Sequence, residues 1–345
     1  MKDNTKRNRK PILIISAVIT LILGAALVGV AAISGGLTRE AWAKADAKTR
    51  AAKGYYETPK EISLTYEADE FKTVNFDLKS DSLKIVKGSG DKFGLNYFED
   101  YENEYTVVAE GGALTFKENA EPEKVVKQIF YPDFSWVLGI FDGFESSDIV
   151  LTVPQDFIFE NIIAKNSSGR IEMEGLTATG TIEAVLSSGN IKIENCNAET
   201  ADIKLSSGKA QLEKCDIKTV ELAFGSGNAE LVKCNIDTAD IEFSSGSAKL
   251  DDCNINAAKV VFSSGGVKFD GCDVKTTDIN FSSGSAVFKD LPGGFTSAVT
   301  SFNIKATSGS VRIDGQGRGN QYTATIASPA YSIKVQLSSG SFKFN

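Results

Sequence analysis

A period of 19 residues constrains this chain more than any other feature of its sequence. Its five cysteines follow one another at that interval, at Cys196, Cys215, Cys234, Cys253 and Cys272. A Ser-Ser-Gly tripeptide recurs in step with them, starting at Ser187, Ser206, Ser244, Ser263 and Ser282, and Gly225-Ser226-Gly227 replaces it once. Because so short a unit cannot bury its own apolar face, the period predicts a stack of repeats that share one core.

Each repeat is expected to form strands. In the unit Ser206–Phe224, apolar and polar residues alternate over 210–212 and again over 220–224, a pattern typical of half-buried β-strands. We expect two short strands per unit, with one turn at Ser-Ser-Gly and the other near Cys215-Asp216. The predicted fold is all-β: a β-solenoid, similar to a single-stranded β-helix, with coils of about 19 residues.

Stacking in register predicts inward rows of equivalent residues. Neighbouring Cβ atoms in such a ladder lie about 4.8 Å apart, whereas a disulfide requires about 3.8 Å. We therefore expect five free, buried thiols rather than disulfides or a soft-metal site. The predicted structural ladders comprise the cysteine row Cys196, Cys215, Cys234, Cys253 and Cys272 and the aromatic row Phe224, Phe243, Phe262 and Phe281.

The repeats occupy the centre of a longer domain. We expect an irregular amino-terminal part with a cap at residues 60–165, regular repeats at 166–290 and irregular coils at 291–345. In that last part, looser copies of the turn begin at Thr307 and then at Ser338. A helical stalk or linker is expected at residues 36–59.

The amino terminus predicts a membrane anchor. Residues 12–33 carry no charge, and as a helix they span about 33 Å, enough for the hydrocarbon core of a bilayer. Five basic residues lie in the tail 1–10, which favours a cytoplasmic amino terminus. We expect a transmembrane signal anchor at 11–35, in a single-pass protein of the cell membrane with an extracytoplasmic carboxy-terminal domain. Small residues near Ala31-Ala32 leave cleavage open as an alternative.

Charge and composition argue against several classes of function. The formal net charge is −8, and residues beyond the basic tail sum to −12, which disfavours nucleic acid as a partner. Histidine is absent, which removes Ser-His and Cys-His nucleophile pairs. An outward acidic row is interrupted by Lys259 and lacks the calcium-roll pattern. We predict no enzymatic activity, no catalytic residues, no metal site and no cofactor.

One aromatic segment lies outside the repeat and has two interpretations. It contains Phe130, Tyr131, Phe134, Trp136, Phe141 and Phe144. We favour a cap packed over one end of the solenoid, since solenoid ends need covers. The alternative is an exposed interaction patch that meets a membrane or a protein partner.

The repeats also resemble a known family. The run Val150-Leu-Thr-Val-Pro154, followed by Ser-Ser-Gly-x-(Ile/Ala)-x-(Leu/Ile) units, is similar to the bacterial β-strand-repeat domain called putative adhesin, a domain of unknown function. The resemblance covers about residues 60–345 and implies a protein anchored to the cell envelope, with no catalytic residues to transfer.

Three functions follow from these observations as expectations. The first is a non-enzymatic adhesin or envelope binding scaffold, whose partner is an envelope protein, a glycan or a host-surface ligand. The alternative is an accessory of an envelope-stress response that acts through a membrane partner. A carbohydrate-active β-helix enzyme ranks third, because such enzymes need clustered carboxylates.

The anchor leads to a direct test. We expect protein isolated from membranes to retain its basic amino terminus, because the uncharged run is longer than the apolar region of most cleaved signals. Edman degradation or peptide mapping of the isolated protein checks this. A mature start near Ala32–Gly36 would show cleavage instead.

Overall fold

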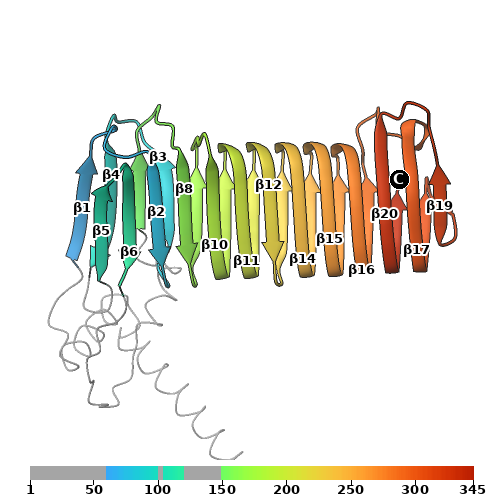
Figure 1. Cartoon of the computed structure of the whole chain (residues 1–345), viewed down its shortest axis with the longest axis horizontal. Helices are drawn as coiled ribbons and strands as arrows, with labels where there is room; N and C mark the ends of the chain where they lie inside the picture. The colour runs from blue at the N-terminus through green and yellow to red at the C-terminus, as the bar shows by residue number, and fades with distance from the viewer. Residues whose placement is uncertain (1–59, 100–103, 120–148) are drawn as a thin grey trace, which may run out of the picture. The chain divides into compact units, whose positions relative to one another are not determined.

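A computed structural model describes residues 60–99, 104–119 and 149–345, which all belong to one compact unit of the chain. This unit is built from β-strands joined into one sheet that winds as a solenoid, which confirms the predicted fold class (Figure 1). The expected tail, anchor and stalk at 1–59 lie outside the described residues. Within the described ranges, no helix has the length and hydropathy to cross a membrane.

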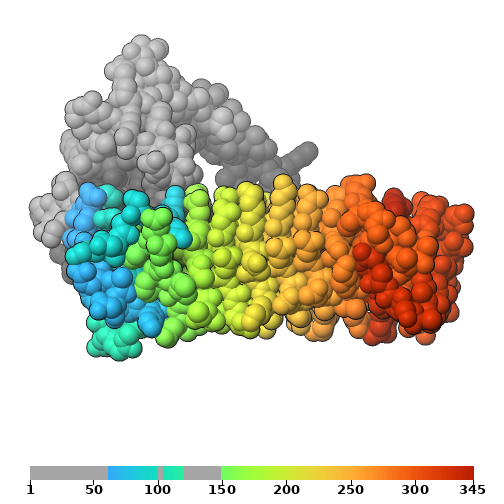
Figure 2. Space-filling view, turned by 90° about the horizontal axis from the view of Figure 1, so that it is seen from above, coloured from blue at the N-terminus to red at the C-terminus, as the bar shows by residue number. Residues whose placement is uncertain are grey.

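The regular coils are parallel and in register. Four of them are single strands of 17 residues, and three of these lie next to one another: β14 (Asn235–Asp251), β15 (Asn254–Asp270) and β16 (Asp273–Lys289). Except at the corners, each residue pairs with its equivalent in the next coil, so that Phe243 lies opposite Phe262. In the space-filling view the coils form successive parallel ridges (Figure 2).

The other regular coils follow the same plan. β10 (Thr181–Glu194) pairs with β11 (Asn197–Glu213), which has 17 residues. The next coil is divided at Gly225–Gly227 into β12 (Asp216–Phe224) and β13 (Asn228–Val232). The expectation of two short strands per coil is therefore wrong for most coils, in which one strand bends through the Ser-Ser-Gly corner without leaving the ladder.

Each coil also has a bend that the alternation did not predict. Between β14 and β15 the pairing skips Asp237, and Ile236 and Ala239 on either side of this bend are both buried. Two outward residues in succession shift the alternation by one residue. A coil therefore has three straight segments and three corners.

The Ser-Ser-Gly corner depends on its glycine. Gly246 has φ 127°, and a Cβ atom there would lie 2.0 Å from the carbonyl oxygen of Gly227 in the preceding coil. The same contact recurs from Gly189 to Gly284. Both the backbone conformation and the close approach exclude other residues at this position.

The second corner lies one residue earlier than expected. The left-handed residue precedes each cysteine, as at Lys214 (φ 53°) and Asp252 (φ 52°). The Asn or Asp after the cysteine begins the next strand instead, and Asn254 Nδ2 donates a hydrogen bond to Asn235 Oδ1 at 2.9 Å. The turn that the sequence placed near Cys215-Asp216 is therefore centred on Lys214, and the Cys215 side chain points inward.

The inward rows form a continuous core. The rings of Phe224 and Phe243 stack with centroids 4.4 Å apart, those of Phe243 and Phe262 stack at 4.7 Å, and Phe281 packs edge-on against Phe262 at 5.1 Å. All four phenylalanines are at most 4% exposed. Such rows bury apolar area in every coil and stabilise the stack.

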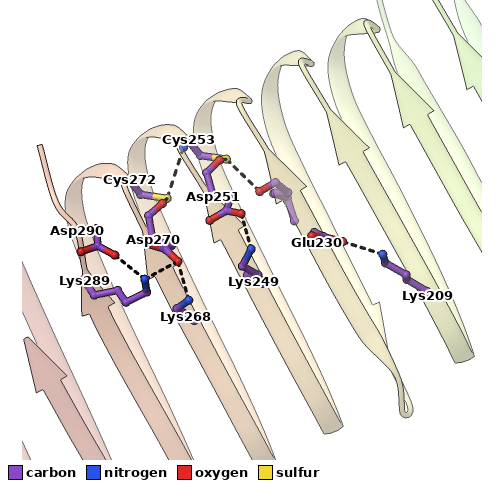
Figure 3. Close-up of polar contacts among 11 residues, drawn as sticks. Lys209, Glu230, Lys249, Asp251, Cys253, Lys268, Asp270, Cys272, Lys289 and Asp290 are labelled. Atoms are coloured by element: carbon purple, nitrogen blue, oxygen red, sulfur yellow. Dashed lines mark hydrogen bonds and ion pairs between the residues drawn. The ribbon is translucent and has the colours of Figure 1, made fainter.

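The five cysteines form a buried row of free thiols. The Cys253 backbone N–H donates to Sγ of Cys272 at 3.4 Å, and the Cys253 thiol donates to the carbonyl of Leu231 at 3.4 Å (Figure 3). Burial raises the pKa of the Cys196 thiol to about 11. A hydrogen bond with Cys234, together with burial, raises the pKa of Cys215. The Cys196 and Cys215 thiols are therefore protonated near neutral pH, and the five buried side chains act as small core residues.

The strand order at the amino-terminal end departs from the sequence order. The first coil consists of β2 (Thr73–Leu78) and β3 (Leu83–Lys87). On one side it pairs with β8 (Asn161–Asn166) and β9 (Arg170–Glu174), and on the other with the later strands β6 and β7. The bounds of those two strands are Ala113–Glu118 and Ile149–Val153. The first coil in sequence is thus the second in space.

The carboxy-terminal end shows the same interleaving. β20 (Tyr331–Phe344) pairs with β16 on one side and with β17 (Thr300–Ile313) on the other, in parallel and in register. The looser copies at Thr307 and Ser338 therefore stack in the reverse of their sequence order. The 3-10 turn Ser297–Val299 lies in the connection that leads to β17.

Antiparallel strands cover both ends of the parallel ladder. At one end, β5 (Tyr105–Glu110) pairs with β6, while β4 (Phe93–Glu99) pairs with β7 and with β1 (Lys60–Tyr66). At the other end, β18 (Gln316–Gly317) and β19 (Gln321–Ala324) fold back onto β17. These strands occupy ladder edges that would otherwise pair with other chains.

The glycine column gives the first stability prediction. Gly246→Ala should lower the free energy of unfolding by about 3 kcal/mol or more, because it adds backbone strain and a clash with the neighbouring coil. Ser245→Ala changes the adjacent exposed residue and should cost no more than about 0.5 kcal/mol. Urea titration of both variants measures the difference, and equal stabilities would refute the role given to the glycine.

The row of buried thiols gives a second prediction, about chemical accessibility and stability. All five cysteines should resist alkylation in the folded protein and react after denaturation, as read by mass spectrometry. Cys234→Ala should cost about 1 kcal/mol through a small cavity, and Cys234→Asp several times more because it buries a charge. Rapid labelling of the native protein would show that the row is accessible.

Candidate binding groove along the serine corner

A groove follows the Ser-Ser-Gly corner across successive coils. One hollow of about 570 Å³ extends from Val185 to Ser263, and a second of about 430 Å³ continues to Lys305 and Ser338. The two hollows share Val261 and Ser263 in their linings, so they form one continuous groove. A groove of this kind fits an extended ligand that contacts several coils.

Three rows of residues build the groove. The corner row of leucine and phenylalanine side chains forms the floor, and the first serine of each Ser-Ser-Gly lies on one side. The other side is formed by the residue that precedes the corner leucine or phenylalanine in each coil. Its side chain points outward because side chains alternate along the strand and its neighbours point inward. We call this the variable row: Val185, Lys204, Ala223, Glu242, Val261 and Asn280.

The groove has its smallest side chains in one central coil. There Ala223 replaces the long residues of the neighbouring coils, and Gly225 replaces the serine. Lys204 and Glu242 flank this coil on either side, two ladder steps or about 9.6 Å apart along the axis. The central coil thus leaves room for a bulky group between two charged side chains.

The charges of Lys204 and Glu242 are partly neutralised by oppositely charged side chains on the same face of the solenoid. Lys204 Nζ lies 2.5 Å from Asp202 Oδ2, and the hydrogen bond between them raises the pKa of Lys204. Glu242 Oε1 lies 3.3 Å from Lys259 Nζ. Glu242 is the one carboxylate that lines either hollow. The groove therefore carries little net charge on an otherwise acidic body.

The face on the other side of the serine corner is occupied by ion pairs (Figure 3). Lys268 Nζ lies 2.6 Å from Asp270 Oδ2, and Lys289 of the next coil lies 3.0 Å from the same oxygen. The hydrogen bond from Lys268 lowers the pKa of Asp270. Lys249 forms the equivalent pair with Asp251. Exposed pairs of this kind contribute little stability each, and they leave this face with balanced charge.

Asp202, Asp240 and Asp278 of the acidic row considered for calcium are also paired with lysines. Lys259 Nζ lies 2.9 Å from Asp240, and Lys334 lies 2.7 Å from Asp278. Among the described residues, no group of three or more His, Cys, Asp or Glu side chains is arranged to hold a metal ion.

The structure separates the residues that the sequence singled out. The phenylalanine row borders the groove as its floor, whereas the cysteine row lies at a different corner, inside the core. The aromatic segment with Phe130, Tyr131, Phe134, Trp136, Phe141 and Phe144 falls outside the described residues. The variable row was not singled out from the sequence, although its residue type changes from coil to coil.

Comparisons with known protein families yield one match. The family model described as Toastrack DUF4097 matches residues 71–344. A comparison with curated proteins yields no match.

Two solved structures are similar. One is a putative adhesin from Bacteroides fragilis, with 12% identity and a TM-score of 0.42, which covers 83% of this chain and 97% of that one. The other is a putative cell adhesion protein from Clostridium sporogenes, with 11% identity and a TM-score of 0.23, which covers 83% and 99%. At these scores neither likeness carries an argument about function. The family match spans nearly all of the described solenoid, and the chain belongs to the Toastrack DUF4097 family.

Proposed function

We propose that this protein is a non-enzymatic, membrane-anchored binding scaffold of the cell envelope, and that it acts as an adhesin through an extracytoplasmic solenoid. The observation that carries the proposal is the continuous groove along the serine corner. The uncharged run at residues 12–33 and the basic tail before it support the anchor and its orientation.

A rigid ladder suits this task. Every coil is hydrogen-bonded to two neighbours, and the glycine column holds the corner backbone in close contact. A ligand that lies along the groove meets equivalent groups at intervals of about 4.8 Å without ordering any loop. Preorganisation of this kind lowers the entropic cost of binding, and contacts from several coils add to the affinity.

The chemistry of the groove favours a neutral linear glycan as ligand. Serine hydroxyls, with Asn280 and Gln336, offer hydrogen-bond donors and acceptors that match sugar hydroxyls. The acidic body repels polyanions, and the charged residues of the groove, Lys204, Lys305 and Glu242, sum to only +1. The small residues Ala223 and Gly225 leave space for a sugar ring.

Binding is favoured over hydrolysis by the same residues. Glycosidases use two carboxyl groups on either side of the scissile bond. Among the described residues, Glu242 is the single carboxylate in the lining of the two hollows, and it is paired with Lys259. This arrangement lacks the second carboxylate of such a mechanism within the groove.

A matched pair of lysine substitutions tests the proposal. Ala223→Lys fills the central coil with the residue that the preceding coil carries at the same position, so the fold should tolerate it. Ser247→Lys adds the same charge on the other side of the corner, where Lys209 is the equivalent residue. We expect Ala223→Lys to weaken binding of chitohexaose by the full-length protein about tenfold or more, and Ser247→Lys to leave it unchanged.

Isothermal titration in detergent micelles measures both affinities. If the unsubstituted protein binds neither neutral oligosaccharides nor any envelope polymer or protein, the scaffold proposal fails. If chitohexaose binds and Ala223→Lys has no effect, the groove is the wrong site.

A further inference from the structure

The space between β16 and β17, which we call the slot, is filled by the later strand β20. β16 and β17 follow one another in sequence but do not pair, because β20 lies between them (Figure 1). We propose that this slot is a strand-binding site, and that it takes the carboxy-terminal strand of a second copy of this chain as well as the chain's own.

β20 is hydrogen-bonded along both of its edges. It pairs in register with β16 from Thr276 to Phe288 and with β17 from Thr300 to Ile313. The Tyr331 ring stacks on Phe295 with centroids 3.9 Å apart, where the strand enters the slot. Its inward side chains are at most 6% exposed: Tyr331, Ile333, Val335, Leu337, Phe342 and Phe344.

The slot does not depend on β20 for its outer wall. The outer edge of β17 pairs with β19, and the Ala306 N–H donates to the carbonyl of Asn320 at 2.8 Å. β16 is held by β15 along its whole length. Both walls therefore precede β20 in the chain, and β20 enters a site whose other faces are already paired.

The slot also selects its occupant. Gly340 has φ 129°, and a Cβ atom there would lie 1.8 Å from the Gly284 carbonyl oxygen. A Cβ atom at Gly309 would lie 2.0 Å from the Gly340 carbonyl oxygen on the other side. An unrelated strand without glycine at this point is excluded, whereas the same strand from a second copy fits at every position. Because β20 of a second copy meets this requirement and also supplies the inward side chains that the slot buries, a second copy of the chain is the partner we propose.

One short linker decides whether the strand comes from the same chain. Residues 325–330 connect β19, on the outer side of β17, to β20 on its inner side. They cross two ladder spacings, about 9.6 Å, around the end of β17. Exchange of such an element between two copies preserves every contact of the slot, and only the linker changes its path.

Strand uptake in the full-length protein tests the site. A protease sequence inserted after Ser328 allows the linker to be cut once the protein has folded. A labelled peptide of residues 331–345 should then replace the cut strand on warming to just below the unfolding transition. The Gly340→Ala peptide should fail to enter, whereas the Lys343→Ala peptide should enter like the unsubstituted one, because Lys343 is exposed. No uptake of the unsubstituted peptide, or equal uptake of Gly340→Ala, would overturn the proposal.

Shortening the linker tests exchange between copies. Deletion of residues 325–330 joins Ala324 directly to Tyr331. This single Cα–Cα step of about 3.8 Å cannot cross about 9.6 Å, so each β20 should enter the slot of another copy. Light scattering should then report a dimer, and adding Gly340→Ala to the shortened chain should abolish it. A shortened chain that remains monomeric would contradict exchange.

Discussion

The close stacking of glycines at the Ser-Ser-Gly corner is the constraint on which the rest of the structure depends. At Gly208 and Gly265 a Cβ atom would lie 1.9 Å from the carbonyl oxygen of the preceding glycine. This contact allows one register between neighbouring coils, because a shift of one residue would place a side chain against backbone and also turn the apolar face outward. The stacked phenylalanines and the buried thiols follow from that register.

The same register determines how the surface is used. Residues at the same repeat position form a straight row along the solenoid. A groove between two such rows therefore continues for as many coils as the rows do. Ala223 and Gly225 open the groove in one coil without disturbing the ladder beyond it. Charged rows pair within a coil, as Lys268 does with Asp270, or with the next coil, as Lys259 does with Asp240. Binding specificity can therefore change at outward positions while the core stays constant.

At both ends of the solenoid the exposed edge of the parallel ladder is covered in the same way. A coil that is terminal in sequence lies one step inside, and the exposed coil beyond it is covered by antiparallel strands. Removing β20 requires the loss of two ladders at once, whereas a strand at a true edge has only one. An interleaved end thus resists unravelling, and it also turns the terminal strand into an element that two copies can exchange.

The sequence by itself determined the length of the coil, the register between coils and most of the core, because the 19-residue period and the alternation within it are local and repeat almost unchanged. It also indicated the glycine at each serine corner. It did not determine the third bend of each coil, at Asp237 and its equivalents, because two outward residues in succession interrupt the alternation there. It also did not determine that the left-handed residue precedes the cysteine. That position carries Asn195, Asp252 and Gly271, which favour this conformation, but also Lys214 and Lys233, which do not. Because an Asn or Asp also follows every cysteine, residue type pointed to both sides of it. Nor did it determine the order of the coils at the ends. The strands β16, β17 and β20 carry the same corner motif, so each can pair with either of the others. Only the tertiary structure chose between these pairings, because the choice depends on the connections around Phe295 and Ala330 and on which edge the antiparallel strands cover.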